Sequence, residues 1–372
     1  MPTDKTRRGF LTVAGAGAAS ALAGCSGGPS SGQTESDQTD AGGDGGDGGD
    51  GSSDTDETTD SVSNTLQMMA TGSIQTLDPI NAKGSGAGYD QYGRSLMEFT
   101  NGLYPPEAAL AEDYEMSEDG LTYTFTLKQG VTFHDGQELT ADDIVYSYRR
   151  LAGSENSRNR DDIIGQTMTI EHEKDASRTT PEDEATLGDY VPGSLAVEAV
   201  DDYTFEMTLA SPFEYTLFQI AGGAFAVLPE GSVGDIQGYD GEYAYNEFFS
   251  TENGGPTYAG LGPFQVDSWT KGSEIQLTAF DDYYGEGPEL DGITYTVVGS
   301  GNTRVSRFKN GNADVLEEMP TASFNPDNVS IEETNGNRSI GTYTFDDGTE
   351  VNYGEIPSLS TEYLVFNTLE VP

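Results

Sequence analysis

Histidine and cysteine, the side chains that most often hold metals or act as nucleophiles, are scarce in this sequence. The 372 residues include two histidines and one cysteine. His134 lies in the stretch FHDG and His172 in EHEKD, and neither has the HExxH spacing of a zinc site. We interpret His134 as a structural turn residue and His172 as a solvated position. We therefore predict no metal site, no cofactor and no catalytic centre.

Two further patterns resemble motifs of hydrolases, but neither is evidence for a hydrolytic site in this chain. The pattern G-x-S-x-G occurs at Gly24–Gly28 and at Gly28–Gly32, within a segment of glycine and serine. A nucleophile elbow needs a strand before the serine and a helix after it, and neither is predicted there. Pairs of acidic residues are abundant, but 64 acidic residues make such pairs uninformative about glycosidase chemistry.

The N-terminus has the features of an export signal. Twin arginines in TRRGFL, Thr6–Leu11, precede an apolar run of 13 residues, Leu11–Ala23. A helix needs about 20 apolar residues to span a bilayer, so this run is too short. The run ends in LAGC, which resembles a lipobox. We predict that residues 1–25 are a twin-arginine lipoprotein signal, with Cys25 lipidated and the protein anchored on the extracytoplasmic face of the membrane.

A flexible tether is predicted to follow the signal. Residues 26–61 are rich in Gly, Ser, Thr and Asp and include GGDGGDGGDG. Calcium binding by aspartates in glycine turns is an alternative, but the known calcium repeat is a nonapeptide and this period is three residues. Residues 26–61 are therefore predicted to be disordered.

The charge of the chain excludes one class of partner. The formal net charge is −47, and only six of the residues are lysines. The phosphate backbone of a nucleic acid would be repelled, so we predict no nucleic-acid binding. Acidic residues occur in every segment, which favours a protein that stays hydrated in very high salt. Charge repulsion there is screened to about 3 Å at 1 M salt. We expect a halophilic source, close to haloarchaea.

Local patterns predict a strand, a turn and a capped helix in succession. Leu121–Leu127 (LTYTFTL) alternates apolar residues with threonine, as in a half-buried strand. An Asp-Gly turn follows in HDGQ, His134–Gln137. Thr140 and Asp143 then have the spacing of a capping box at the start of a helix. That helix would bury one face, formed by Ile144, Val145, Tyr148 and Leu151.

These elements belong to a longer series of motifs. The stretch ALAEDYEMSEDGLTYTFTLKQGVTFHDGQELTADDIVYSYRRL, Ala109–Leu151, resembles the signature of the family 5 solute-binding proteins of ABC importers. SIQTLDPINA, Ser73–Ala82, is similar to the opening strand and Leu-Asp-Pro loop of that family. Further similar stretches follow in the family's order: VEAVDDYTFEMTLASPF, GLGPFQVDSWTKGSEIQLTAFDDYYGEGPELDGITYTVV, RVSRFKNGNADVLEEMP and YLVFNTLEVP.

The resemblance implies an α/β fold of the periplasmic-binding-protein type, with two lobes around a ligand cleft. Residues 62–94 and 196–297 would form the first lobe, and 95–195 an extra subdomain of it. Residues 298–372 would begin the second lobe.

The resemblance also implies a function. The chain would be an extracytoplasmic receptor that delivers oligopeptides or dipeptides to an ABC permease, as a monomer and without catalysis. A sugar or nickel-chelate receptor of the same family is an alternative, as are a cell-surface hydrolase and a chemosensory receptor that does not transport. The ligand-contacting loop of the family matches Lys83, Gly84, Ser85 and Gly86, with Tyr89 nearby. An ordinary surface loop is the alternative for these residues. Trp269 is interpreted as a packing residue, with sugar stacking as the alternative.

Three features depart from the family pattern. YLVFNT, Tyr363–Thr368, resembles an interior strand of the second lobe, so we expect a truncated chain whose second lobe is incomplete. Asn335–Pro357 is longer than expected before that strand. Arg158–Tyr190 has the composition of a polar, acidic insertion with little core signal.

Overall fold

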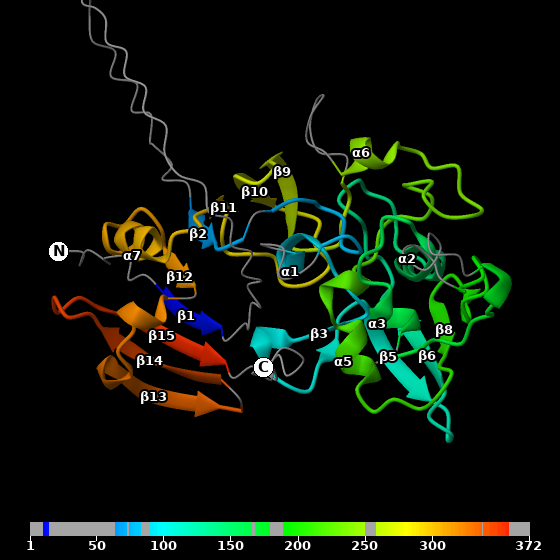
Figure 1. The fold of residues 1–372 in the computed structure, drawn as a ribbon, viewed down its shortest axis with the longest axis horizontal. Helices are drawn as coiled ribbons and strands as arrows, with labels where there is room; N and C mark the ends of the chain where they lie inside the picture. Colours follow the sequence, from blue (N-terminus) through cyan, green and yellow to red (C-terminus); the bar gives the residue numbers. More distant parts are fainter. Residues whose placement is uncertain are drawn as a thin grey trace, which may run out of the picture. The chain divides into compact units, whose positions relative to one another are not determined.

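The fold is known from a computed structural model, which describes residues 10–14, 64–72, 74–82, 89–165, 168–178, 189–249, 258–317, 319–336 and 338–356. All of them fall within one compact unit made of Met1–Gly15 and Asn64–Leu359. Across these ranges the strands form four sheets (Figure 1). No helix in the described part of the chain is long and apolar enough to cross a membrane. The predicted tether and Cys25 lie outside the described residues.

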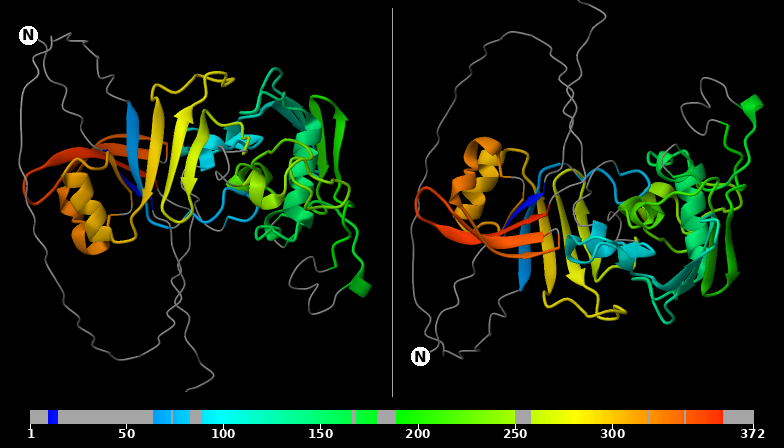
Figure 2. Two further views of the ribbon diagram at one scale, coloured as in Figure 1. Left: turned by 90° about the horizontal axis from the view of Figure 1, so that it is seen from above. Right: turned by 90° about the horizontal axis from the view of Figure 1, so that it is seen from below.

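The first sheet joins the beginning of the described chain to its middle. Its strand order is β2-β11-β10-β9, with β2 at Thr65–Ala70, β11 at Gly292–Val297, β10 at Glu274–Ala279 and β9 at Phe264–Thr270. β9, β10 and β11 are antiparallel neighbours, whereas β2 is parallel to β11. Figure 2 shows the blue strand β2 beside these yellow strands. The sheet thus brings together residues from 62–94 and 196–297.

The second sheet contains the predicted strand. Its order is β5-β6-β8-β7, with β5 at Ala111–Met116, β6 at Thr122–Leu127, β8 at Thr204–Thr208 and β7 at Val197–Asp201. β6 confirms the period-two prediction, because Tyr123, Phe125 and Leu127 are buried and the threonines between them are not.

One boundary differs from the expected lobes. The resemblance places β7 and β8 in the main sheet of the first lobe, but β8 pairs antiparallel with β6, which lies in residues 95–195. The physical reason is the apolar face of β8, since Phe205 and Met207 lie opposite Phe125 and Tyr123 in the register. All four side chains are buried in one core cluster.

The capped helix is also confirmed. α2 spans Ala141–Gly153 and packs against β7 and β8. At its start, the Asp143 carboxylate accepts hydrogen bonds from the Thr140 backbone N–H at 2.7 Å and from the Thr140 hydroxyl at 3.1 Å. The predicted face of Ile144, Val145, Tyr148 and Leu151 is buried.

Short elements fill the space around these two sheets. The short helices are α1 (Tyr89–Tyr92), η1 (Thr100–Gly102), α3 (Asp161–Ile164), η2 (Ala176–Arg178), α5 (Thr216–Ile220), η3 (Gly223–Phe225) and α6 (Tyr245–Phe248). The two-stranded sheet pairs β3 (Met97–Glu98) with β4 (Glu107–Ala108).

The expectation of little core signal in Arg158–Tyr190 is wrong. Ile163, Met168, Ile170 and Tyr190 all lie in the largest core cluster, each with at most 1% of its surface exposed. Their spacing is irregular, so no periodic pattern marked them in the sequence. A few scattered apolar side chains are enough to hold this polar segment on the core.

The third sheet has the order β12-β1-β15-β14-β13. The strands are β12 (Val315–Glu317), β1 (Phe10–Ala14), β15 (Glu350–Ile356), β14 (Arg338–Thr344) and β13 (Val329–Asn335). The helices α7 (Gly301–Lys309), η4 (Thr321–Ser323) and η5 (Pro326–Asn328) come from the same part of the chain. The unexpectedly long segment Asn335–Pro357 contains β14 and β15, which are antiparallel neighbours. A core cluster that includes Phe308, Leu316, Tyr343 and Tyr353 joins these elements.

β1 lies inside the predicted export signal. In the sheet it is parallel to both of its neighbours, with Phe10 opposite Val315 of β12 and Asn352 of β15. Cleavage before Cys25 would remove this strand, so β12 and β15 would lose the strand that pairs with both of them. The signal function of residues 1–25 stays a prediction.

Candidate functional site

The Leu77-Asp78-Pro79 loop is fixed by a buried ionic network. Asp78 is fully buried, and its Oδ2 lies 3.1 Å from a terminal guanidinium nitrogen of Arg150. The same guanidinium contacts Asp235 at 2.7 Å through Nε and again through a terminal nitrogen. The Tyr245 hydroxyl donates to Asp78 Oδ2 at 2.9 Å. One arginine therefore neutralises two buried carboxylates from distant parts of the chain.

The pKa values of the two carboxylates in this network are shifted in opposite directions. Burial raises the pKa of Asp78, although Arg150 and Tyr245 oppose this effect. Burial also acts on Asp235, but its hydrogen bonds and ion pair with Arg150, together with donors from Ser154 and Asn156, hold its pKa below the ordinary value. Both carboxylates raise the pKa of Arg150 against the effect of its burial. The guanidinium thus stays charged.

A second set of contacts holds the residues just after Asp78. The Asn159 side-chain amide donates to the carbonyl of Ala82 at 2.6 Å and to that of Pro79 at 3.3 Å. The Arg158 backbone N–H donates to the carbonyl of Ile80 at 2.9 Å. The chain is therefore fixed up to Ala82. The predicted ligand contacts Lys83, Gly84, Ser85 and Gly86 follow directly, and they lie outside the described residues.

Tyr89, the last predicted ligand contact, begins α1. Its side chain is buried, and its hydroxyl donates to the carbonyl of Thr76 at 3.1 Å. Its ring lies 5.1 Å from that of Tyr92. Tyr89 therefore connects α1 to the segment that leads into the Leu-Asp-Pro loop.

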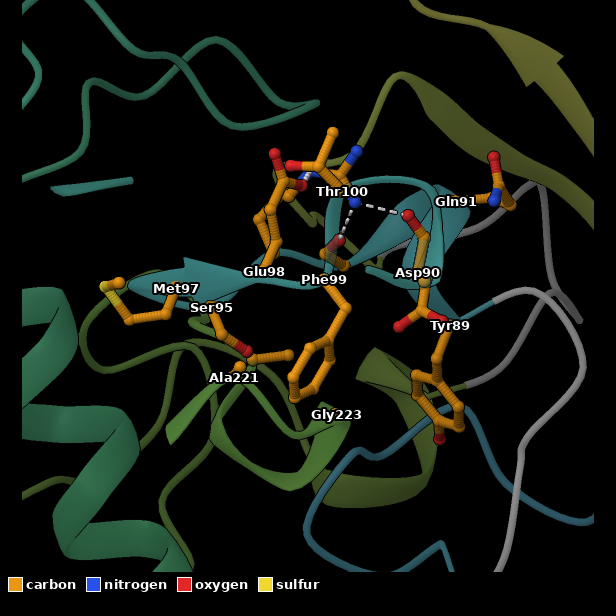
Figure 3. Close-up of a pocket in the computed structure, with 14 residues that line it drawn as sticks. Tyr89, Asp90, Gln91, Ser95, Met97, Glu98, Phe99, Thr100, Ala221 and Gly223 are labelled. Carbon is orange, nitrogen blue, oxygen red and sulfur yellow. Dashed lines mark hydrogen bonds and ion pairs between the residues drawn. The ribbon is translucent and has the colours of Figure 1, made fainter. Parts of the chain in front are cut away.

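A cavity of about 480 Å³ opens beside α1 (Figure 3). It is bounded by α1 and the residues after it, by β3 and η1, and by the chain around α5 and η3. Its lining residues are Tyr89, Asp90, Gln91, Gly93, Arg94, Ser95, Met97, Glu98, Phe99, Thr100, Gly102, Ala221, Gly223 and Ala226. We call this the first cavity.

A second cavity of about 340 Å³ adjoins it. Tyr89, Asp90 and Gly223 line both cavities. The second cavity is also lined by Pro79, Ala82 and Asn159, the residues of the clamp described above. We call the two cavities together the groove; the shared residues place both of them beside Tyr89, and the second reaches Pro79 and Ala82.

The groove has one arginine, which is already engaged. Arg94 Nε lies 3.4 Å from Glu98 Oε2 and 3.3 Å from the hydroxyl of Tyr283, and a terminal nitrogen donates to the carbonyl of Asp90. The Asp90 carboxylate, in contrast, is exposed and has no hydrogen-bond or ion-pair partner within the described ranges. The groove therefore offers a carboxylate and backbone groups to a ligand, with its cation held in place.

The backbone of the Gly260-Leu261-Gly262-Pro263 segment packs directly against α1. The Gly262 N–H donates to the carbonyl of Tyr92 at 3.2 Å. A Cβ added at Gly260 would overlap the backbone oxygen of Tyr92, and one at Gly262 would overlap that of Gln91. Both positions therefore require glycine, because the backbone approaches α1 too closely for any side chain.

His134 holds this segment with both ring nitrogens. Nδ1 accepts a hydrogen bond from the Gly260 N–H at 3.2 Å, and Nε2 lies 2.9 Å from the carbonyl of Gly262, to which it donates. The ring also packs edge-on against Phe280, with centroids 4.9 Å apart. This arrangement needs a neutral imidazole, and burial lowers the pKa of His134. The interpretation of His134 as a structural residue is thus confirmed.

Replacing His134 with phenylalanine is expected to lower the free energy of unfolding by about 1–3 kcal/mol at pH 7.5, because a buried carbonyl and a buried N–H lose their partner. The lowered pKa means that the unfolded chain takes up the proton first, so the contribution of His134 is complete above pH 6.5 and declines below it. Denaturant unfolding should therefore show a smaller deficit at pH 5.5 than at pH 7.5. A deficit that is equal at both pH values would contradict this role, and His172→Gln is the matched control.

The other residues considered from the sequence have structural positions. Trp269 packs against the core cluster of the first sheet, and its indole N–H donates to the carbonyl of Ile74 at 3.3 Å, which confirms the packing interpretation. His172 Nδ1 lies 2.8 Å from the carbonyl of Ile170. Across the described residues, no group of three or more His, Cys, Asp or Glu side chains could hold a metal ion.

Comparison with known proteins identifies the family. The sequence model for "Bacterial extracellular solute-binding proteins, family 5 Middle" matches residues 105–372. The chain belongs to this family. It is 28% identical over 324 residues to the dipeptide-binding protein of Escherichia coli K12, covering 83% of this chain and 52% of that protein. It is 27% identical over 262 residues to the glutathione-binding protein GsiB of Salmonella typhimurium, covering 68% of this chain and 42% of that protein.

Solved structures show the same fold. Haemophilus influenzae OppA, in complex with the peptide RPPGFSPFR, aligns with a TM-score of 0.58 at 19% identity, covering 75% of this chain and 52% of that one. The family 5 chain therefore has the periplasmic-binding-protein fold predicted from its motifs. It spans about half the length of the curated relatives it matches.

Sequence reasoning located one side of the groove and missed the other. It selected Tyr89 from the family loop, but not Arg94, Glu98 or the residues Ala221 to Gly223. No local pattern marks Ala221 to Gly223, since they line the cavity only because α5 packs against β3.

Proposed function

We propose that this chain is a lipid-anchored, extracytoplasmic receptor that binds peptides and delivers them to an ABC permease, without catalysis. The observation that carries the proposal is the groove beside α1, which continues the segment that leads into the family's ligand loop. The names of its relatives support peptides as the ligand class, since they include dipeptide-binding and glutathione-binding proteins.

In this proposal Lys83, Gly84, Ser85 and Gly86 contact the ligand, with Tyr89 supporting their loop. The glycines let the peptide approach the backbone, which supplies N–H and C=O groups along an extended ligand. Asp90 is available for a peptide ammonium group. The twin-arginine motif and the LAGC sequence support export and lipidation at Cys25, and monomeric action with permease subunits completes the proposed role.

Sensing without transport and binding of sugars or nickel chelates are alternatives within the same fold. Arg94 is already paired with Glu98, and the described residues contain no cluster of side chains that could hold a metal ion. Neither observation specifically supports a nickel chelate as the bound ligand. A carboxylate-bearing groove is better suited to a peptide ammonium than to a neutral sugar.

Filling the groove tests whether it is the binding site. Gly223 lines both cavities, and a Cβ there would meet no atom within 4 Å, so Gly223→Leu should fold normally and occupy ligand space. We expect it to weaken binding of the tripeptide Ala-Ala-Ala by at least tenfold in isothermal titration calorimetry on the 372-residue chain.

Gly287→Leu is the matched control for this experiment. A Cβ at Gly287 also meets nothing within 4 Å, but this residue lines neither cavity. Equal affinities in Gly223→Leu and Gly287→Leu would place the binding site elsewhere. Binding of a sugar or a nickel chelate in place of the tripeptide would favour the alternatives.

A further inference from the structure

Four aromatic side chains form a connected cluster that meets the first cavity at Phe99. We define this aromatic wall as Phe99, Tyr104, Tyr215 and Phe218. We infer that the wall is a selectivity subsite, which takes an aromatic or large apolar side chain of the bound peptide. This inference rests on the proposed function, because it concerns a peptide lying in the groove.

The wall is assembled from two segments that are distant in the sequence. Phe99 and Tyr104 flank η1, whereas Tyr215 is the N-cap of α5 and Phe218 lies within that helix. The Phe99 ring lies 4.6 Å from that of Phe218 and 5.6 Å from that of Tyr104. Tyr104 and Phe218 are 5.2 Å apart, and Tyr215 lies 6.4 Å from Phe218. These separations are those of interacting aromatic pairs.

The wall continues directly from the cavity. Phe99 lines the first cavity together with Thr100 and Gly102, and Figure 3 shows its ring above Gly223. On the other segment, Ala221 and Gly223 follow Phe218 closely and also line the cavity. A peptide whose backbone lies in the groove can therefore place a neighbouring side chain on the wall.

Two of the four rings are exposed, and Phe99 and Phe218 between them are partly buried. Tyr215 is 58% exposed and Tyr104 is 37% exposed, although the chain as a whole carries a charge of −47. Contiguous exposed apolar surface with a polar rim is typical of a binding site.

Charged residues adjoin the wall in the sequence at Glu214, which is exposed, and at Glu98, which is paired with Arg94. Glu333 and Arg338 line a cavity with Leu103, beside Tyr104. The centre of the wall consists of the mutually packed rings of Phe99, Tyr104 and Phe218.

The chemistry of the wall matches one ligand class best. A planar side chain such as that of phenylalanine can stack on or pack edge-on against the exposed rings and lose its contact with water. High salt screens ionic contacts and, for salts excluded from protein surfaces, strengthens apolar burial. In a salt-rich environment the wall would therefore discriminate between peptides more effectively than the charges of the groove.

A tripeptide pair tests the inference on the 372-residue chain. Isothermal titration calorimetry should show that Ala-Phe-Ala binds at least tenfold more tightly than Ala-Ala-Ala, since burial of a phenylalanine side chain supplies that difference. In Phe218→Ala and in Tyr215→Ser, the ratio of the two affinities should fall toward one while the affinity for Ala-Ala-Ala is retained. Tyr215→Ser decides the question if Phe218→Ala does not fold, because Tyr215 is largely exposed.

Tyr114→Ser provides the matched control. Tyr114 is 38% exposed on β5 and lines neither cavity, so the affinity ratio should stay at its original value. If Ala-Ala-Ala and Ala-Phe-Ala bind equally well, the wall is not a subsite although the chain is still a peptide receptor. A preference that survives both wall variants, or wall variants that change only thermal unfolding or oligomeric state, would likewise overturn the inference. If neither tripeptide binds, both the subsite and the proposed receptor function are wrong.

Discussion

Replacing Arg150 with leucine is expected to lower the free energy of unfolding by about 3–5 kcal/mol. Arg150 is the only cation in contact with Asp78 and Asp235 among the described residues, and its own side chain is 1% exposed. Leucine would fill part of the space but leave two buried carboxylates without a counter-charge. The remaining donors, from Tyr245, Ser154 and Asn156, are neutral and cannot replace it.

The pH dependence of this deficit distinguishes charge from packing. In Arg150→Leu both carboxylates would have raised pKa values, since burial would act on them without the opposing guanidinium. When the pKa of a carboxyl group is raised in the folded state, the free energy of unfolding of the protein falls as the pH rises above the ordinary carboxyl pKa of about 4. Urea unfolding should therefore show a deficit that is largest at pH 7 and shrinks toward pH 4.5.

Two comparisons make this prediction specific. Arg158 is exposed in the segment just after α2, so Arg158→Leu should change the free energy of unfolding by less than about 0.5 kcal/mol. Arg150→Lys keeps the charge but loses the bidentate contact, and should lie between wild type and Arg150→Leu. A pH-independent deficit in Arg150→Leu would show that the carboxylates are not the cause.

Gly262→Ala is expected to lower the free energy of unfolding by about 3 kcal/mol, which is the upper end of the usual range for overpacking. The added methyl group would overlap the backbone oxygen of Gln91 and also approach the Cα of Tyr92. Backbone atoms of a packed helix cannot move aside as the end of a flexible side chain can. The overlap can be relieved only by displacing α1 or by separating it from the Gly260-Leu261-Gly262 segment.

Displacement of α1 should also weaken ligand binding, because Tyr89, Asp90 and Gln91 of this helix line the first cavity. Calorimetry with Ala-Ala-Ala is expected to show reduced affinity even at temperatures where Gly262→Ala is fully folded. Gly299→Ala is the control, since a Cβ at Gly299 meets nothing within 4 Å. Wild-type stability and affinity in Gly262→Ala would refute the close approach described here.

Some elements could be predicted from the sequence because their signals are local. The alternation in Leu121–Leu127 reports which side of a strand is buried, and β6 has that pattern. The Thr140 and Asp143 pair marks a helix start because a side chain three residues on can reach the first free N–H groups, and α2 begins there. The ordered motifs extended these local signals to the family.

Other features depend on contacts that no local pattern encodes. Arg150 lies 72 residues from Asp78 and 85 from Asp235, and each of these residues alone resembles any other charged residue in an acidic chain. The pairing of β8 with β6 was missed for the same reason, since an apolar strand face does not specify its partner. The hairpin of β14 and β15 appeared in the sequence only as an unexpected length of chain.

The sequence by itself determined the family, the strand, turn and helix of the signature segment, and the structural role of His134. These conclusions depend on residue order and short-range geometry, which the chain carries before it folds. Only the tertiary structure decided that Asp78 shares an arginine with Asp235, that the groove has a second side made of Ala221 to Gly223, and that aromatic rings from η1 and α5 meet at its rim. Each of these requires segments about 70 or more residues apart to come into contact, which only packing of the folded core brings about.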